Sequence, residues 1–182
     1  MVGWAEPPYA DRVPSDDALA SAVRLTAEAA GEHAAGLAEL LAGRRLTVAT
    51  AESLTGGTIA SVLAAAPDAA EWFRGCVVAY SAEVKVEVLG VPPGPVVTRT
   101  CATTMARAAA DLLGADVCVA VTGLGGPDPD PGEDEPPGTV WLAVVGPDGA
   151  EHAERRVFPG DPADVVTATT ARALVLLREA VG

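Results

Sequence analysis

The sequence predicts a layered α/β fold, with helices on a mixed, mostly parallel sheet that includes one hairpin. Three observations predict it. Short apolar runs rich in β-branched residues alternate with helical patterns along the chain. The run at residues 116–122 is almost entirely apolar, which is typical of a central strand covered on both faces. Gly146-Pro-Asp-Gly149 separates two later strand patterns, which indicates a hairpin.

Local signals place each element in chain order. Thr98 is a candidate N-cap, and glycines such as Gly43 and Gly114 stand where helical spacing ends. The predicted helices cover residues 15–41, 56–65, 82–89, 99–113 and 162–181. The predicted strands cover residues 46–51, 76–80, 116–122, 139–145 and 151–158. Residues 123–138, rich in Gly, Pro and acids, are expected to form a long loop that is either functional or mobile.

Length and charge limit the functions open to the chain. Its 182 residues suffice for a core without disulfides or a structural metal, and we expect one domain at residues 15–182 after a flexible tail at residues 1–14. Lys and Arg number 12 against 25 Asp and Glu, for a net charge of -13. Such a surface repels phosphate backbones and anionic lipid, so we expect no nucleic-acid or membrane partner.

Cysteine and histidine usage argues against a metal site. Cys76, Cys101 and Cys118 lack metal-ligand spacing, and the histidines are His33 and His152. An odd number of thiols in apolar surroundings is typical of a reducing compartment. No apolar run reaches the length of a membrane span, and the N-terminus has prolines and acids instead of a basic and apolar leader. We therefore expect a cytoplasmic protein.

The first segment that can carry chemistry is Ala-Glu-Ser-Leu-Thr-Gly-Gly at residues 51–57, between a predicted strand and a predicted helix. A serine at the carboxyl end of a strand, here Ser53, lies at the rim where α/β proteins bind ligands. The helix start supplies free N–H groups and a positive dipole end, which suit an anion or a developing oxyanion. The alternative is that Ser53 or Thr55 simply caps the helix.

The second segment is Tyr-Ser-Ala-Glu-Val-Lys at residues 80–85, again at a strand-to-helix junction. Eleven of the twelve cations are arginine, and Lys85 is the one lysine. Arginine cannot lose its proton in a protein whereas a buried lysine can, so Lys85 is a candidate base for a nucleophilic serine. The alternative is a solvated helix residue paired with Glu83 or Glu87.

The third segment is Val-Thr-Gly-Leu-Gly-Gly-Pro at residues 121–127, a glycine-rich turn directly after the predicted central strand. Its N–H groups can be presented to a phosphate. No P-loop lysine follows, so the segment does not indicate hydrolysis of nucleoside triphosphates.

From residue 46 to the end, the chain resembles the CinA C-terminal domain family, whose stand-alone bacterial members are nicotinamide-nucleotide amidases. The resemblance rests on the three segments above and on further motifs in the right order and spacing. These are Phe-Arg-Gly-Cys-Val-Val-Ala-Tyr-Ser (73–81), Leu-Gly-Val (89–91), Met-Ala (105–106), Gly-Thr-Val-Trp (138–141) and Phe-Pro-Gly-Asp (158–161).

The resemblance implies a serine amidohydrolase that needs no metal or organic cofactor. Ser53 matches the family's nucleophile, Lys85 matches its base, and Tyr80 matches a tyrosine at the same site. Ser53 would attack the carboxamide of nicotinamide mononucleotide, and neutral Lys85 would take its proton and pass it to departing ammonia. Water would then release nicotinic acid mononucleotide. Relatives are usually oligomeric, which implies a homo-oligomer.

Further residues are expected to contact the substrate. The oxyanion donors are expected either at the helix start near Thr55, Gly56 and Gly57, or at the turn of Thr122 and Gly123. The predicted substrate-binding residues are Thr55, Gly56, Gly57, Arg74, Thr122, Gly123 and Gly126.

The sequence also departs from the family pattern around the expected site. Ala69, Ala70 and Ala82 stand where the family usually has Ser, Ser and Asn, and Pro162 replaces an arginine that follows Phe-x-Gly-Asp. The arginines that can take its place are Arg74, Arg155 and Arg156. Five carboxylates at residues 128–135 stand where an anionic substrate would pass. The alternative function is therefore a catalytically silent binding or scaffold module of the same fold.

Overall fold

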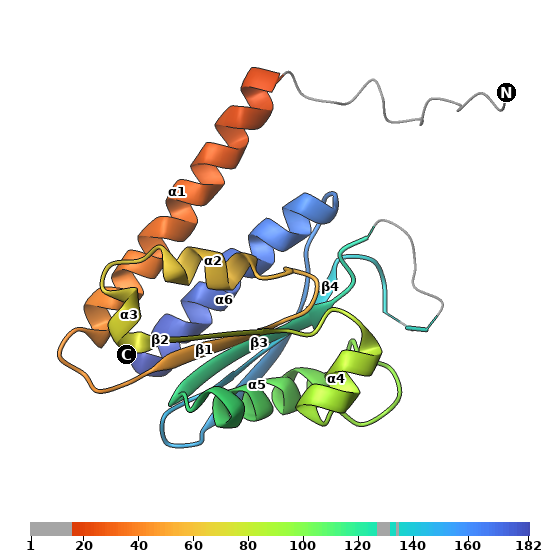
Figure 1. Cartoon of the computed structure of the whole chain (residues 1–182). Helices are drawn as coiled ribbons and strands as arrows, with labels where there is room; N and C mark the ends of the chain where they lie inside the picture. Colours follow the sequence, from red (N-terminus) through yellow and green to blue (C-terminus); the bar gives the residue numbers. More distant parts are fainter. Residues whose placement is uncertain (1–15, 127–131, 134) are drawn as a thin grey trace, which may run out of the picture.

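The computed structural model describes residues 16–126, 132–133 and 135–182, and places five strands and six helices within these ranges (Figure 1). The strands are β1 (Val48–Glu52), β2 (Phe73–Val78), β3 (Val117–Gly123), β4 (Thr139–Val145) and β5 (Glu151–Val157). The helices are α1 (Asp16–Leu41), α2 (Thr58–Ala64), α3 (Ala69–Trp72), α4 (Ala82–Leu89), α5 (Arg99–Leu113) and α6 (Pro162–Val181). The predicted tail at residues 1–14 lies outside the described residues.

The strands form one mixed sheet in the order β2-β1-β3-β4-β5. β1 pairs in parallel with β2 and β3, whereas β3–β4 and β4–β5 are antiparallel pairs, the second being the predicted hairpin. Among the strands of the described residues β4 alone is reversed, so the prediction of a mostly parallel sheet with one hairpin is confirmed. The carboxyl ends of β1, β2 and β3 therefore meet at one edge of the sheet, where α/β proteins place their ligands.

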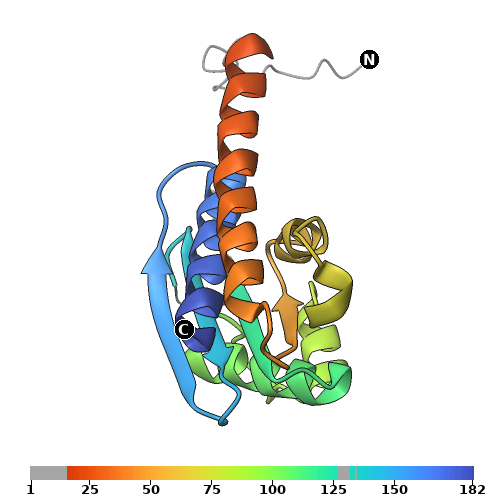
Figure 2. The same cartoon turned by 90° about the vertical axis from the view of Figure 1, so that its left-hand side faces the viewer.

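Helices cover both faces of the sheet, as the alternation of side chains along its strands requires. Figures 1 and 2 show α1, α2 and α6 on one face and α4 and α5 on the other. In β3, the side chains of Val117, Val119 and Val121 pack with the first group of helices, and those of Cys118 and Ala120 pack with the second. All five side chains are fully buried, which confirms the predicted central strand.

The chain between α2 and β2 differs from the prediction. It contains a single helical turn, α3, which begins after Asp68 in a left-handed conformation (φ 53°), and β2 then starts at Phe73 instead of residue 76. Trp72 closes this turn: its buried indole N–H donates to the Pro67 carbonyl at 3.1 Å, and its ring centroid lies 6.2 Å from that of Phe73. One turn is too short to leave a helical period in the sequence, so the pattern could not predict it.

Helix α1 extends beyond the body of the molecule at its amino-terminal half (Figures 1 and 2). In the half whose side chains are described, Ala30, Ala34, Leu37 and Leu41 belong to the core that α1 shares with α6. These residues recur at intervals of three or four, as in an amphipathic helix. The carboxyl-terminal half of α1 therefore anchors the helix to the rest of the fold.

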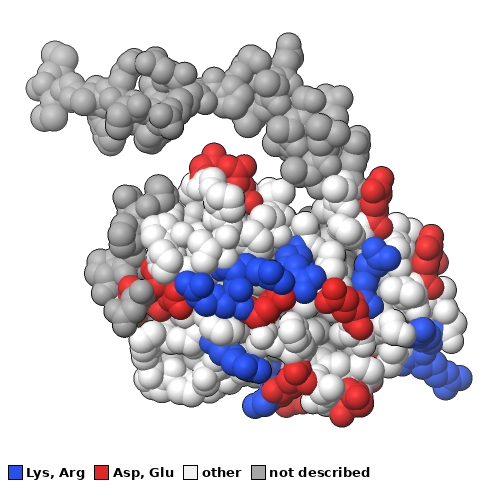
Figure 3. Space-filling model, turned by 180° about the vertical axis from the view of Figure 1, so that it is seen from behind, with Lys and Arg blue, Asp and Glu red and all other residues white. Residues whose placement is uncertain are grey.

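An ion-pair group joins the edge strand β5 to α6. Figure 3 shows cations and anions interleaved on the face seen from behind. The Glu154 carboxylate accepts hydrogen bonds from Arg172 of α6 at 2.6 and 3.0 Å and from Arg156 at 3.0 and 2.8 Å. The hydrogen bonds from Arg172 lower the pKa of Glu154 to about 2 with help from Arg156, although partial burial raises it. The ionised carboxylate thus ties the hairpin to the last helix.

We predict that Glu154→Gln lowers the free energy of unfolding at pH 7 by about 1–3 kcal/mol. Because the folded-state pKa lies below the ordinary value of 4.5, the carboxylate stabilises the fold above pH 4.5, and this contribution is lost as the pH falls toward 2. Urea unfolding over a pH series measures the difference between the two proteins, which should shrink below pH 4.5 and vanish near pH 2. Glu39→Gln, at an exposed α1 position, is the control. A difference that does not vary with pH would contradict the prediction.

Candidate active site

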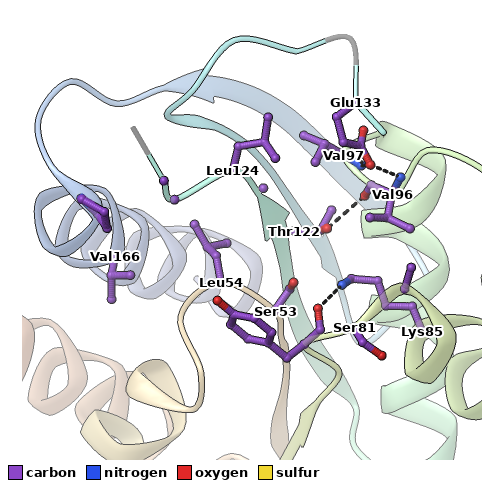
Figure 4. Close-up of a pocket in the computed structure, with 16 residues that line it drawn as sticks. Ser53, Leu54, Ser81, Lys85, Val96, Val97, Thr122, Leu124, Glu133 and Val166 are labelled. Carbon is purple, nitrogen blue, oxygen red and sulfur yellow. Dashed lines mark hydrogen bonds between the residues drawn. The ribbon is translucent and has the colours of Figure 1, made fainter. Parts of the chain in front are cut away.

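A cavity of about 860 Å³ opens at the carboxyl-terminal edge of β1 and β3 (Figure 4). Its walls come from the ends of these strands, the start of α4, the segment before α5 and the start of α6. The predicted site residues that line it are Ser53, Tyr80, Lys85, Thr122, Gly123 and Gly126. The structure thus brings together the three segments that the sequence indicated.

Ser53 follows β1 directly and is held in a tight turn. Its side chain is 6% exposed and lines the cavity, and its carbonyl accepts a hydrogen bond from the Gly56 N–H at 3.0 Å. Neither Ser53 nor Thr55 caps α2, because the N-cap is Gly57 (φ 100°), which has no capping side chain. The interpretation of Ser53 as a helix cap is therefore wrong.

The carboxylate of Glu52 takes the place of a cap. It is fully buried and accepts hydrogen bonds from the Thr55 hydroxyl at 2.7 Å and from three N–H groups at the start of α2. These N–H groups belong to Gly57 at 2.9 Å, Ile59 at 3.2 Å and Ala60 at 2.8 Å. Sequence reasoning missed Glu52, although an acid shortly before a helix start is a signal for such a contact.

The contacts of Glu52 correct the predicted source of oxyanion donors at the helix start. The N–H groups of Gly57, Ile59 and Ala60 point to this carboxylate, whereas the N–H groups of Gly56 and Thr58 donate to the carbonyls of Ser53 and Thr55. Thr55, Gly56 and Gly57, all within the described residues, lie outside the cavity wall. Because the Thr55 hydroxyl and the N–H groups of Gly56 and Gly57 are already engaged, their position does not support the predicted substrate-binding role.

Lys85 lies inside the fold. It is 1% exposed, and its amine donates a hydrogen bond to the Tyr80 carbonyl at 2.9 Å. The hydroxyl of Ser81 caps α4, the helix that carries Lys85, by accepting an N–H of the first turn. Lys85 is buried and forms no ion pair with a described carboxylate, so its interpretation as a solvated partner of Glu83 or Glu87 is wrong.

Burial lowers the pKa of the Lys85 amine. Three groups oppose this effect and favour the protonated form: the thiol of Cys101 and the carboxylates of Glu133 and Glu83. A lowered pKa increases the fraction of neutral amine, which is the form that accepts a proton. The cavity therefore contains a candidate base.

Figure 4 shows the side chains of Ser53 and Lys85 directed into the same part of the cavity. No hydrogen bond joins these two described side chains, and the hydrogen bond of the amine goes to the Tyr80 carbonyl. The phenol ring of Tyr80 is 73% exposed at the cavity. The structure thus gathers the three predicted catalytic residues without a direct bond between nucleophile and base.

The glycine-rich turn after β3 forms another wall. The Thr122 hydroxyl is buried and donates to the Val96 carbonyl at 2.9 Å, so it holds the segment before α5. A Cβ at Gly123 would lie 2.5 Å from the Thr139 carbonyl oxygen, so only glycine allows β3 to approach β4 here. Gly126 lies on the cavity wall at the end of the described part of this turn.

Among the described residues of the predicted acidic loop, Glu133 reaches the cavity. The Glu133 carboxylate lines it and accepts hydrogen bonds from the Val96 N–H at 2.6 Å and the Val97 N–H at 3.1 Å (Figure 4). Residues 127–131 and 134 of this loop lie outside the described residues. A carboxylate therefore occupies the backbone donors on this side of the cavity.

The structure does not place Arg74 at this cavity. Arg74 is the second residue of β2, so it lies at the amino-terminal end of the strand, opposite the edge that carries Ser53. There it lines a separate cavity of about 460 Å³ together with Arg44 and Arg45. The prediction that Arg74 binds the substrate beside Ser53 is therefore not supported by its position.

The other two candidate arginines are engaged elsewhere. Arg155 pairs with Glu135 at 2.5 Å, and Arg156 pairs with Glu154 at 2.8 Å. Within the part of the chain that the structure describes, no arginine lines the cavity of Ser53, and the one cationic side chain there is Lys85.

The described residues contain no group of three or more His, Cys, Asp or Glu side chains placed to hold a metal ion. The three cysteines are free thiols, two of them buried. In the same ranges, no helix has both the length and the apolar composition needed to cross a bilayer.

Comparison with known proteins finds relatives over most of the chain. The family model described as CinA C-terminal domain matches residues 31–181. Curated relatives named CinA-like protein include those of Frankia casuarinae, 40% identical over 144 residues, and Mycobacterium avium, 42% identical over 151 residues. These matches cover 76% and 78% of this chain but 33% and 34% of the relatives, so the chain spans about a third of their length.

Solved structures share the fold. A competence-damaged protein (CinA) superfamily protein from Klebsiella pneumoniae superposes with a TM-score of 0.78 and 32% identity, over 84% of this chain and 97% of that one. A protein of the same superfamily from Enterobacter cloacae gives a TM-score of 0.80 and 30% identity, over 84% of this chain and 92% of that one. The same arrangement of helices and strands therefore recurs in chains of similar extent.

We predict that Lys85→Met raises the free energy of unfolding at pH 7 by about 1–3 kcal/mol, because methionine fills similar space without a buried amine. The folded-state pKa of Lys85 lies below the ordinary value of 10.5, so the unfolded state binds more protons and the stability of the native protein rises with pH up to about 10.5. The advantage of Lys85→Met should therefore shrink as the pH rises toward that value. Thermal unfolding from neutral to alkaline pH measures it, with the charged variant Lys85→Arg expected to lose stability. A lower melting temperature for Lys85→Met at pH 7 would contradict the prediction.

Proposed function

Because the chain belongs to the CinA C-terminal domain family, we propose that it is an amidohydrolase that converts nicotinamide mononucleotide to nicotinic acid mononucleotide and ammonia. The observation that carries the proposal is a buried lysine, Lys85, that shares one cavity with Ser53. The family is associated with this deamidation, and the two residues match its base and its nucleophile. Since the chain spans a third of its curated relatives, the proposed activity is that of this domain.

In the proposed reaction, the Ser53 oxygen attacks the carboxamide carbon while the neutral Lys85 amine takes the hydroxyl proton. A carbon–oxygen bond forms, and the carbonyl oxygen becomes an oxyanion. Collapse of this intermediate breaks the carbon–nitrogen bond, and Lys85 gives its proton to the departing ammonia. Water then attacks the acyl-enzyme with Lys85 as base, which releases the acid and restores Ser53. No metal or organic cofactor takes part.

Two features of Lys85 support this role. Burial lowers its pKa, which favours the neutral amine, and the Tyr80 carbonyl holds its nitrogen at the cavity. A neutral amine that donates one N–H to a carbonyl keeps its lone pair for another partner, here the Ser53 hydroxyl. Catalytic hydrogen bonds are often long in a free site and shorten when substrate binds, so the missing bond between the two side chains is compatible with the proposal.

We propose that the glycine-rich turn supplies the oxyanion donors. The start of α2 is unsuited because its N–H groups already donate to the Glu52 carboxylate or, for Thr58, to the Thr55 carbonyl. Gly125 and Gly126 line the cavity, and their N–H groups donate to no other described residue. Backbone donors that are fixed before the reaction are effective stabilisers of an oxyanion.

The cavity suits a mononucleotide better in size than in charge. Its volume of about 860 Å³ falls within the range of small-molecule sites, roughly 300–1,000 Å³. In the described residues its ionisable side chains are Lys85 and Glu133, so when Lys85 is the neutral base a phosphate meets the Glu133 carboxylate without a facing cation. We propose a cytoplasmic homo-oligomer that acts on this small molecule, without a nucleic-acid or membrane partner.

The second candidate function is a catalytically silent binding module. Two departures from the family pattern, Ala82 and Pro162, line the cavity, whereas Ala69 and Ala70 belong to α3 and do not. A thermal-shift assay with nicotinamide mononucleotide and with its acid product separates the candidates, because a ligand that binds the folded state raises the melting temperature. Ammonia release favours the enzyme. If the melting temperature does not shift and no ammonia is released, the results favour a silent module with an altered pocket.

We predict that Ser53→Ala and Lys85→Met each lower kcat for ammonia release from nicotinamide mononucleotide by about 100- to 10,000-fold. Each substitution removes a group that takes part in the transition state. Arg74→Ala, at the other end of the sheet, should leave kcat/KM unchanged and serves as the control. Activity that survives the loss of either Ser53 or Lys85 would rule out the proposed pair.

We predict that Glu133→Gln moves the acid limb of the kcat/KM profile to lower pH and decreases KM several-fold. The Glu133 carboxylate favours the protonated amine of Lys85 and repels an anionic substrate, so its neutralisation lowers the Lys85 pKa further and removes the repulsion. Glu83→Gln is the matched control, because Glu83 also acts on Lys85 but is exposed and lies outside the cavity. It should move the limb less and leave KM unchanged. Coincident pH profiles for wild type and Glu133→Gln would disprove the prediction.

A further inference from the structure

Glu52 lies between the two halves of the proposed serine–lysine pair. We infer that Glu52 is the positioning residue that sets the turn of Ser53 and brings this turn to Lys85. The inference rests on the proposed function, in which these two residues act together. It gives a role to a buried carboxylate that lies outside the cavity wall of the described residues.

The side chain of Glu52 closes a loop around Ser53. Glu52 is the last residue of β1, and its carboxylate accepts hydrogen bonds from groups further along the chain. Ser53 and Leu54 therefore lie between the backbone of Glu52 and the residues that its side chain binds. The bonded groups are the Thr55 hydroxyl and the N–H groups of Gly57, Ile59 and Ala60. Inside this loop, the Gly56 N–H donates to the Ser53 carbonyl at 3.0 Å. The position of the Ser53 hydroxyl therefore depends on the carboxylate.

The backbone of Glu52 reaches the other half of the pair. Its carbonyl accepts a hydrogen bond from the Ala79 N–H at 2.8 Å, one residue before Tyr80. The Tyr80 carbonyl in turn accepts the hydrogen bond of the Lys85 amine at 2.9 Å. Glu52 thus holds the turn of Ser53 through its side chain. Through its main chain it holds the segment whose Tyr80 carbonyl binds the Lys85 amine.

A carboxylate suits this place because each of its partners is a donor. Besides the turn and α2, the Thr50 hydroxyl at 3.3 Å and the Cys76 thiol at 3.5 Å approach one of its oxygens. A glutamine has the same shape but presents an NH2 group in place of one oxygen, and this group cannot accept a hydrogen bond. Glu52→Gln therefore leaves buried N–H groups without an acceptor, which favours rearrangement of the turn.

Steady-state kinetics of Glu52→Gln test the inference. We expect kcat for the deamidation to fall by about 100-fold with little change in KM, because a displaced nucleophile slows the reaction without removing substrate contacts. Thr47→Val is the matched control: it removes the hydrogen bond between the Thr47 hydroxyl and Asp116 at the opposite end of the sheet. It should keep the wild-type kcat when both variants are assayed well below their melting temperatures. Glu52→Asp, which keeps two acceptor oxygens, should recover part of the lost rate.

A second readout does not require the proposed substrate. Labelling of Ser53 by a fluorophosphonate probe, followed by mass spectrometry, reports the reactivity of the hydroxyl. The labelling rate should fall in Glu52→Gln and stay unchanged in Thr47→Val. If the wild type is labelled but releases no ammonia, the proposed substrate is wrong while the labelling rates still decide the role of Glu52. A wild type that is neither labelled nor active would overturn both proposals.

Two variants of Thr55 cover the case in which Glu52→Gln does not fold. Thr55→Val removes one donor to the carboxylate, and Thr55→Ser keeps a hydroxyl there. The first should slow labelling of Ser53, and the second should retain most of the rate. Equal kcat and labelling rates in Glu52→Gln and Thr47→Val, or equal labelling in the two Thr55 variants, would overturn the positioning role.

Discussion

A buried carboxylate at the end of β1 is the contact on which the rest of the site depends. Parallel strands end at the same edge of a sheet, so the turn after β1 and the turn after β2 are neighbours. Glu52 accepts hydrogen bonds from both turns: its carboxylate accepts one from Thr55 in the first, and its carbonyl accepts one from Ala79 in the second. Its main chain and side chain therefore define the space between Ser53 and Lys85, although these two side chains share no direct hydrogen bond.

Among the described cations of this acidic chain, three arginines and Lys85 have opposite surroundings. Arg155, Arg156 and Arg172 pair with carboxylates at the surface, where each guanidinium keeps its charge. Lys85 is enclosed at the cavity without such a partner among the described residues, and a charged amine in these surroundings is unfavourable. The burial that destabilises its charged form also lowers the pKa of the amine, which suits the base that we propose. The buried amine of Lys85 therefore lowers the stability of the fold at the position where the proposed chemistry requires a neutral amine.

The sequence predicted the layers, the hairpin and the meeting of three segments, because apolar periodicity and strand ends depend on neighbouring residues. The prediction for Arg74 failed because the predicted strand began at residue 76. In the structure β2 begins at Phe73, so Arg74 lies at the amino-terminal edge of the sheet, opposite the cavity. Glu52 was missed for a different reason. Its partners extend from Thr55 to Ala60, and only the path of the turn brings them to one carboxylate. No local pattern encodes that path.

The support of the Lys85 amine has a consequence for how such a site can diversify. The oxygen that holds it belongs to the main chain of Tyr80, whose ring extends into solvent. A main-chain oxygen is present whatever side chain is attached, so residue 80 can be exchanged for another without removing the acceptor. Substitutions at residue 80 can therefore change the rim of the cavity, and with it the ligand that binds, while the Lys85 amine keeps the same hydrogen-bond acceptor.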